Sequence, residues 1–161
     1  MPDPAARGAG RVHPLVRELL AEGLAVRLRV TGRSMAPWIV DDDEVTLEPC
    51  APGVAALGDV VLAQAPGRPP VLHRVVSASR LAGGGRRIVT KGDALNTPDP
   101  PVGEELLLGR VTSVRRAGGC PAGRPGSGPV RRAAAVLAAL ASRTTPRLFA
   151  TVSRRLASRA A

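Results

Sequence analysis

Residues 71–90, VLHRVVSASRLAGGGRRIVT, contain two runs rich in Val and Ile on either side of three consecutive glycines. β-Branched residues favour extended backbone, and glycine readily adopts the positive φ angles that tight hairpin turns use. The stretch therefore predicts a β-hairpin whose strands are 71–77 and 86–90, with residues 83–85 reversing the chain.

Similar short apolar runs occur on both sides of this hairpin, separated by Gly, Pro or Asp, at 24–31, 44–47, 59–63 and 106–114. Many short runs with this punctuation are typical of an antiparallel β domain. A mainly β fold is therefore expected.

A short helix is expected before the first strand. Leu15, Leu19 and Leu20 are spaced as on a helix, Pro14 suits a first turn, and Gly23 suits the end. These residues are too few for a helix-turn-helix domain.

A chain of 161 residues is long enough for one domain with appendages. We divide it into an N-terminal segment with the helix (1–23), a core (24–116), a flexible Gly- and Pro-rich linker (117–129) and a basic tail (130–161). Two helices are expected in the tail, on either side of Pro146.

The formal net charge of +10 is unevenly distributed along the chain. Residues 1–114 contain 13 basic and 13 acidic residues, whereas residues 115–161 contain 10 Arg and no acid. The core is therefore neutral, and the basic extension is predicted to bind a polyanion. Trp38 and Phe149 are the only aromatic residues, which argues against a base-stacking surface for nucleic acid. Nucleic-acid binding through the tail stays an alternative, and it would show as a steep salt dependence.

We expect the tail to dock on an anionic membrane surface. On a helix starting near Arg147, apolar residues recur at intervals of three and four: Phe149, Val152, Leu156 and Ala160. The alternative is that the tail helices pack on the β core. Residues 1–10 contain no apolar run of the kind a secretory signal needs, and the apolar run 133–141 is too short to cross a bilayer. These features predict a cytoplasmic protein without a transmembrane span, peripheral at the membrane through its tail.

Three stretches contain the residue types of a nucleophilic site. In residues 32–37, GRSMAP, Ser34 lies in a tight turn that can expose its hydroxyl and leave its N–H as an oxyanion donor, with Gly32 supplying the turn. His73 lies inside a β-branched run, and residues 90–99 supply Asp93 and Asp99. A serine, a histidine and an acid are the groups needed to activate a hydroxyl near neutral pH.

Five short motifs follow one another along the core: Gly32-x-Ser34-Met35-x-Pro37, Gly58-Asp59-Val60-Val61, His73-Arg74-Val75-Val76, Lys91-Gly92-Asp93 with Asp99 six residues on, and Leu108-Gly109-Arg110-Val111. In this order they resemble the signal peptidase and LexA-type serine peptidase superfamily, over roughly residues 24 to 114. Bacterial signal peptidases and LexA-like proteases have a lysine where this chain has His73, whereas the endoplasmic-reticulum and archaeal branch has histidine.

The resemblance implies a largely β fold and a serine endopeptidase. Ser34 would be the nucleophile, His73 the general base and Asp99 the acid that orients His73, with Asp93 a close second. It also implies a substrate segment bound in extended form by strand addition, with small residues near the cut. Met35 and Pro37 are expected to contact that substrate. Such a mechanism needs no metal and no organic cofactor.

Two departures from the superfamily are expected: the sequence before the core predicts neither the N-terminal membrane anchor of signal peptidases nor the DNA-binding domain of LexA-like repressors. The first departure argues against cleavage of exported preproteins. The main alternative to a peptidase is a catalytically silent relative that binds an extended peptide or a membrane partner. Lys91, the only lysine, is expected to be solvated and charged, and residues 41–44 to form a solvated acidic loop. Cys50 and Cys120 are expected to be ordinary thiols, because their spacing fits neither a zinc site nor a disulfide framework.

Overall fold

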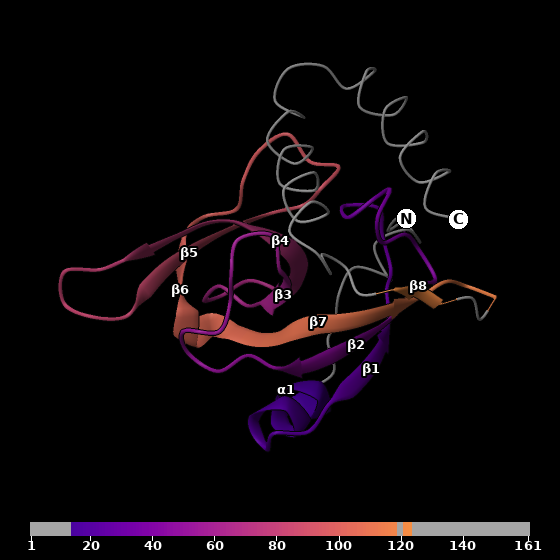
Figure 1. Cartoon of the computed structure of the whole chain (residues 1–161), viewed down its shortest axis with the longest axis horizontal. Helices are drawn as coiled ribbons and strands as arrows, with labels where there is room; N and C mark the ends of the chain where they lie inside the picture. The colour runs from indigo at the N-terminus through magenta and orange to yellow at the C-terminus, as the bar shows by residue number, and fades with distance from the viewer. Residues whose placement is uncertain (1–13, 119–120, 124–161) are drawn as a thin grey trace, which may run out of the picture.

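The computed structural model of the chain describes residues 14–118 and 121–123, and its architecture is mainly β (Figure 1). One curled antiparallel sheet has the strand order β1-β2-β7-β3-β4-β5-β6, and β8 pairs with β7. The elements are α1 (Pro14–Ala21), β1 (Val26–Arg29), β2 (Glu44–Pro49), β3 (Val60–Ala63), β4 (Val71–Arg80), β5 (Arg86–Lys91), β6 (Val102–Gly103), the 3₁₀ helix η2 (Glu104–Leu106), β7 (Leu107–Arg115) and β8 (Pro121–Gly123). The predicted fold class is confirmed.

Each of the six predicted apolar runs contains a strand, and the glycines at 83–85 form the turn of the β4–β5 hairpin, closed by hydrogen bonds between Leu81 and residues 84 and 85. The sequence did not predict β6, which is two residues long and follows two prolines. A strand of that length leaves no alternating pattern to recognise.

The expectation of an irregular linker over 117–129 is wrong for residues 121–123. These residues form β8, which pairs with Val114 and Arg115 at the end of β7. Main-chain hydrogen bonds hold the pair, and proline is tolerated on such an edge strand. The remainder of the predicted linker, the tail helices, Cys120 and residues 1–13 lie outside the described residues.

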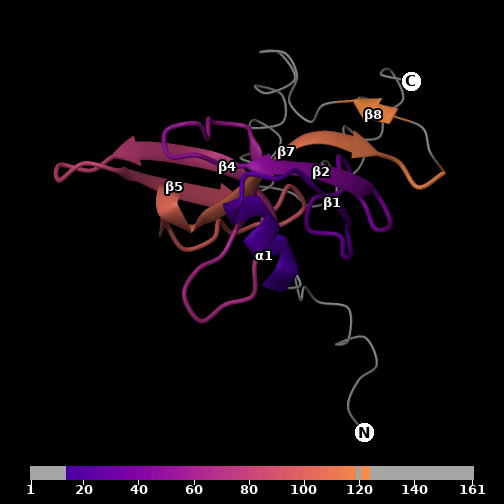
Figure 2. The same ribbon diagram turned by 90° about the horizontal axis from the view of Figure 1, so that it is seen from below.

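Helix α1 begins at Pro14 as expected and lies against β1, β2 and β7 (Figure 2). Its C-terminus is closed by hydrogen bonds from Gly23 N–H to the Leu20 carbonyl (3.1 Å) and from Leu24 N–H to the Leu19 carbonyl (2.9 Å). The buried residues of the helix are Val16 and Leu20. The buried face therefore differs from the expected one, because Leu15, which was expected to belong to it, is 51% exposed. The spacing of four places Val16 and Leu20 on one face.

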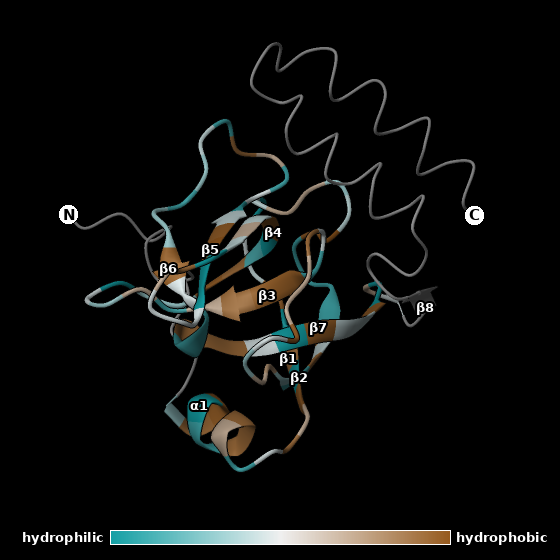
Figure 3. Ribbon diagram, turned by 60° about the vertical axis from the view of Figure 1, so that its left-hand side comes forward, coloured by the Kyte–Doolittle hydropathy of each residue, from teal (hydrophilic) through white to brown (hydrophobic). Residues whose placement is uncertain are grey.

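The central strand β3 is buried along its whole length, and Figure 3 shows it as hydrophobic. Its alternate residues enter two separate cores. Val60 and Leu62 join the core that includes α1 and β2, and Val61 and Ala63 join the core that includes Cys50 and Ile88. The neighbouring strand β4 therefore also presents its side chains to two different environments.

The register between β3 and β4 places the two motif residues of β4 on opposite faces. His73 is opposite Val61 and Arg74 is opposite Val60. Because directly opposed residues share a face of the sheet, His73 lies on the side of the second core and Arg74 on the side of the first. Within residues 14–118 and 121–123, no helix is long and apolar enough to cross a membrane.

Candidate active site

Ser34 lies in the loop that connects β1 to β2, and the base of this loop is held by main-chain bonds. Val30 N–H donates to the Asp43 carbonyl (2.7 Å), and Asp42 N–H donates to the Val30 carbonyl (2.9 Å). Gly32 has a φ of 100°, which favours glycine. Its N–H donates to Asp41 Oδ1 at 2.8 Å. The turn that carries Ser34 is therefore fixed from both ends.

The expectation of a solvated loop at residues 41–44 is wrong for Asp43, which is 1% exposed. Its carboxylate accepts hydrogen bonds from the Val40 N–H (2.9 Å) and from Arg116 Nη1 (2.6 Å). A buried carboxylate needs such partners to offset the loss of hydration. Two acids of this loop thus have different partners, because Asp41 binds the Gly32 N–H whereas Asp43 binds Arg116.

The Ser34 turn packs directly on the segment that follows β5. The Ser34 carbonyl accepts a hydrogen bond from Ala94 N–H at 2.8 Å. A Cβ atom at Gly92 would lie 2.8 Å from the same carbonyl oxygen and equally close to Leu95, so any larger residue at position 92 would force the two segments apart. The motifs at 32–37 and 91–93 are therefore in contact, although they are far apart in sequence.

His73 is 5% exposed and belongs to a short hydrogen-bonded chain. Its Nδ1 lies 2.6 Å from Asp99 Oδ2, and the same oxygen accepts a hydrogen bond from Thr90 Oγ1 at 2.7 Å. The Asp99 N–H also donates to the Thr90 carbonyl at 2.8 Å. Burial acts to raise the pKa of Asp99, but the hydrogen bonds from His73 and Thr90 outweigh it and lower that pKa. An ionised Asp99 favours the tautomer in which Nδ1 carries the proton and Nε2 is the basic nitrogen.

Ser34 and His73 line the same pocket, which has a volume of about 200 Å³. Its other lining residues come from the β1–β2 loop and from the start of β4: Val30, Thr31, Gly32, Met35, Pro69, Pro70, Val71 and Leu72. Within the described chain, neither Ser34 Oγ nor the Ser34 N–H makes a hydrogen bond, so the hydroxyl is not bonded to His73. Hydrogen bonds between a nucleophile and its base are often long without substrate.

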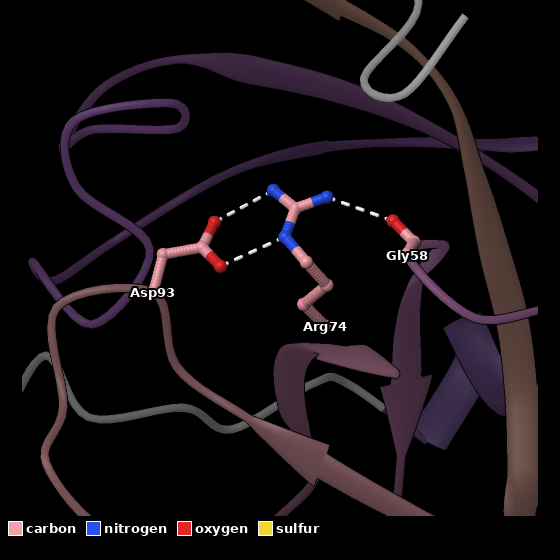
Figure 4. Close-up of polar contacts among 3 residues, drawn as sticks. All are labelled: Gly58, Arg74 and Asp93. Atoms are coloured by element: carbon pink, nitrogen blue, oxygen red, sulfur yellow. Dashed lines mark hydrogen bonds and ion pairs between the residues drawn. The ribbon is translucent and has the colours of Figure 1, made fainter. Parts of the chain in front are cut away.

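Asp93 makes no hydrogen bond to His73 and forms a separate ion pair with Arg74 (Figure 4). Arg74 Nε and Nη2 donate to the two carboxylate oxygens of Asp93 at 2.8 and 2.6 Å, and Nη1 donates to the Gly58 carbonyl at 2.8 Å. Both side chains are 1% exposed. Burial raises the pKa of Asp93, while the hydrogen bond and charge of Arg74 oppose that rise. Of the two predicted acids, Asp99 is the one placed to orient His73.

Replacing Arg74 by methionine is expected to destabilise the fold by about 3–5 kcal/mol, because it leaves the Asp93 charge buried without a partner. Chemical denaturation monitored by circular dichroism measures the change. The matched control is the double variant with Arg74→Met and Asp93→Leu, which removes both charges and should recover most of the loss. Equal stability of the Arg74→Met variant and the parent would contradict the assignment of this pair.

The expectation that Lys91 is solvated is wrong, because Lys91 is 1% exposed. It ends β5 directly opposite Arg74, so both cations lie on the same face of the sheet. The charge of Lys91 opposes the rise that burial causes in the pKa of Asp93, so Arg74, Lys91 and Asp93 belong to one buried cluster. Lys91 is not among the residues that line the pocket of Ser34 and His73.

Of the two expected substrate-contacting residues, Met35 contributes to the pocket wall but is 2% exposed and belongs to the first core. Pro37 does not line the pocket; it follows Ala36 through a cis peptide bond. Sequence reasoning missed Thr90 and the Pro69-Pro70 wall. A threonine in a strand and prolines in a loop carry no local signal of such a role.

No protein-family model, curated protein or solved structure matches this chain. The superfamily resemblance therefore rests on the sequence motifs alone. Four of those motifs lie on strands that are neighbours in the sheet or at their ends, namely β7, β3, β4 and β5.

Proposed function

We propose that this protein is a serine endopeptidase that resembles the signal peptidase and LexA-type superfamily and uses Ser34, His73 and Asp99. The observation that carries the proposal is the hydrogen-bonded chain Thr90–Asp99–His73, which ends at a pocket that Ser34 also lines. The hydroxyl of a serine is a weak nucleophile on its own. A histidine oriented by a carboxylate activates such a hydroxyl by accepting its proton.

In this mechanism the substrate carbonyl enters the pocket and Ser34 Oγ attacks its carbon. His73 Nε2 accepts the hydroxyl proton, because Nδ1 is engaged by Asp99. The Ser34 N–H, which makes no hydrogen bond within the described chain, donates to the oxyanion that forms. Collapse of this intermediate breaks the peptide bond as His73 returns the proton to the leaving amine. Water activated by the same histidine then hydrolyses the ester on Ser34.

A fluorophosphonate probe tests the proposal without knowledge of the substrate, since it forms a covalent bond only with an activated serine. We expect one modification per molecule, at the peptide that contains Ser34 when the digest is read by mass spectrometry. A Ser34→Ala variant should not be labelled, and an unfolded sample should lose labelling. Absence of labelling in the folded parent protein would reject the peptidase assignment.

The second candidate function is a silent peptidase relative that binds an extended peptide. It is favoured by one observation, that Ser34 Oγ makes no hydrogen bond to His73 in this structure. A protein of this kind would bind peptides in the same pocket but would not react with the fluorophosphonate.

Replacing Asp99 by asparagine is expected to reduce the rate at which Ser34 reacts by up to about 10⁴-fold, because the neutral amide no longer favours the required tautomer of His73. Asp42→Asn is the matched control, since the Asp42 side chain is exposed and forms only a long contact with Arg29 (3.7 Å) within the described chain. The comparison is made by the rate of fluorophosphonate labelling. Equal rates for the Asp99→Asn variant and the parent would remove Asp99 from the mechanism.

The parent protein and the Asp99→Asn variant should also differ in how their free energy of unfolding depends on pH. The folded state lowers the pKa of Asp99, so its contacts stabilise the parent fully above the unfolded value of about 3.9. That contribution is lost as pH falls through the lower, folded value. The part of the stability difference between parent and Asp99→Asn that comes from the ionised Asp99 should therefore shrink below about pH 4.

A further inference from the structure

Two exposed arginines, one in each of two loops, lie next in sequence to residues that line the pocket of Ser34 and His73. Arg33 lies between Gly32 and Ser34, which both line the pocket. Arg68 directly precedes the Pro69-Pro70 wall, in the loop that connects β3 to β4. The pocket is lined mostly by apolar residues.

Neither arginine is neutralised within the described part of the chain. Arg33 and Arg68 form no ion pair there. The acids near the pocket have other partners: Asp99 bonds His73, and Asp41 bonds the Gly32 N–H. The positive charge of Arg68 acts on Asp99, because it is among the causes that lower the pKa of that carboxyl.

The rest of the chain offers little compensation. Outside residues 14–118 and 121–123, Asp3 is the only acidic residue, and the chain as a whole carries a formal charge of +10. A partner that approaches the pocket therefore meets two cations whose counter-ions the protein does not supply.

We propose that Arg33 and Arg68 select substrate segments that carry an Asp or Glu next to the residue that enters the pocket. The inference rests on the proposed function only in taking this pocket as the place where the peptide binds. A pocket of about 200 Å³ accepts one aliphatic side chain. In an extended peptide the adjacent side chain points the other way, out of the pocket, where an exposed arginine next to a lining residue can meet it.

An acidic peptide fits this arrangement better than an anionic membrane surface. The arginines belong to two loops that both contribute lining residues to one concave site, and such a site suits a single side chain better than a flat layer of lipid headgroups. Arginine also binds a carboxylate through two parallel hydrogen bonds, so a single acidic side chain can engage one guanidinium fully.

The test uses the Ser34→Ala protein, which should bind peptides without cleaving them, and capped fluorescent heptapeptides with one central valine and Glu, Gln or Lys on either side of it. Fluorescence polarisation should give a Kd for the Glu peptides about tenfold lower than for the Gln peptides, with Lys weakest. Adding Arg33→Gln or Arg68→Gln should each reduce the ratio, and the pair should bring it to about one. Arg87→Gln, an exposed arginine on β5, is the matched control and should leave the ratio unchanged.

The proposal is overturned if the peptides bind equally, if none of them binds measurably, or if the ratio survives both substitutions. It is also overturned if the two substitutions release the protein from phosphatidylserine vesicles while the peptide ratio is already one, which would make the arginines a membrane contact. Fluorophosphonate labelling of the parent separates this failure from that of the peptidase assignment. Selective binding without labelling would reject catalysis and keep the acidic preference.

Discussion

Replacing Ser34 by alanine is expected to lower kcat by about 10⁶-fold, the loss seen when the nucleophile of a serine peptidase is removed. Peptide hydrolysis, once a substrate has been found among synthetic peptides, measures this loss. The fold should be unaffected, because the Ser34 side chain makes no hydrogen bond within the described chain and the contacts of residue 34 are made by its carbonyl. Alanine preserves the bond from the Ala94 N–H to that carbonyl.

Ser77→Ala is the matched control, since Ser77 is an exposed serine on β4. It should leave both hydrolysis and the melting temperature unchanged. Full activity of the Ser34→Ala variant would show that the nucleophile has been misassigned, whereas a fall in its melting temperature would mean that the hydroxyl has a structural role.

Replacing His73 by alanine is expected to be nearly as damaging as replacing Ser34, because the two groups act as a unit. The double variant should therefore be no worse than either single variant. Since His73 is buried on β4, the rate is compared per folded molecule, with circular dichroism as the check. A double variant that loses activity multiplicatively would indicate that His73 and Ser34 act independently.

The Lys91→Met variant tests whether the general base is His73 or Lys91. Methionine keeps most of the volume of this buried side chain and removes its charge, so we expect most of the activity to remain. A larger loss in Lys91→Met than in His73→Ala, at equal folded fraction, would point to a serine–lysine pair instead.

The fold class and most of the strands could be predicted from the sequence because strand formation has a local cause. β-Branched runs separated by turn residues specify extended segments whatever they pair with, and the six predicted runs all contain strands. The shortest elements, β6 and β8, could not be predicted, because their backbone pairing depends on a neighbour and not on their own side chains.

The candidate catalytic residues could also be found in the sequence, because their side chains can act as nucleophile, base or acid and they lie in five ordered motifs. These residues are Ser34, His73, Asp93 and Asp99. Their partners could not. The loop from Gly92 to Asp99 has no periodicity, so nothing local indicates which acid turns toward the histidine.

The sequence by itself determined a neutral, mainly β core with a serine on a glycine turn, a histidine in a strand and two acids in one loop. Only the tertiary structure decided how these groups pair. Adjacent residues of a strand face opposite sides of a sheet, so His73 and Arg74 each meet a different acid, Asp99 for the first and Asp93 for the second. The strand register likewise decided the burial of Lys91, because it lies opposite Arg74 in a cluster where Asp93 offsets part of the positive charge.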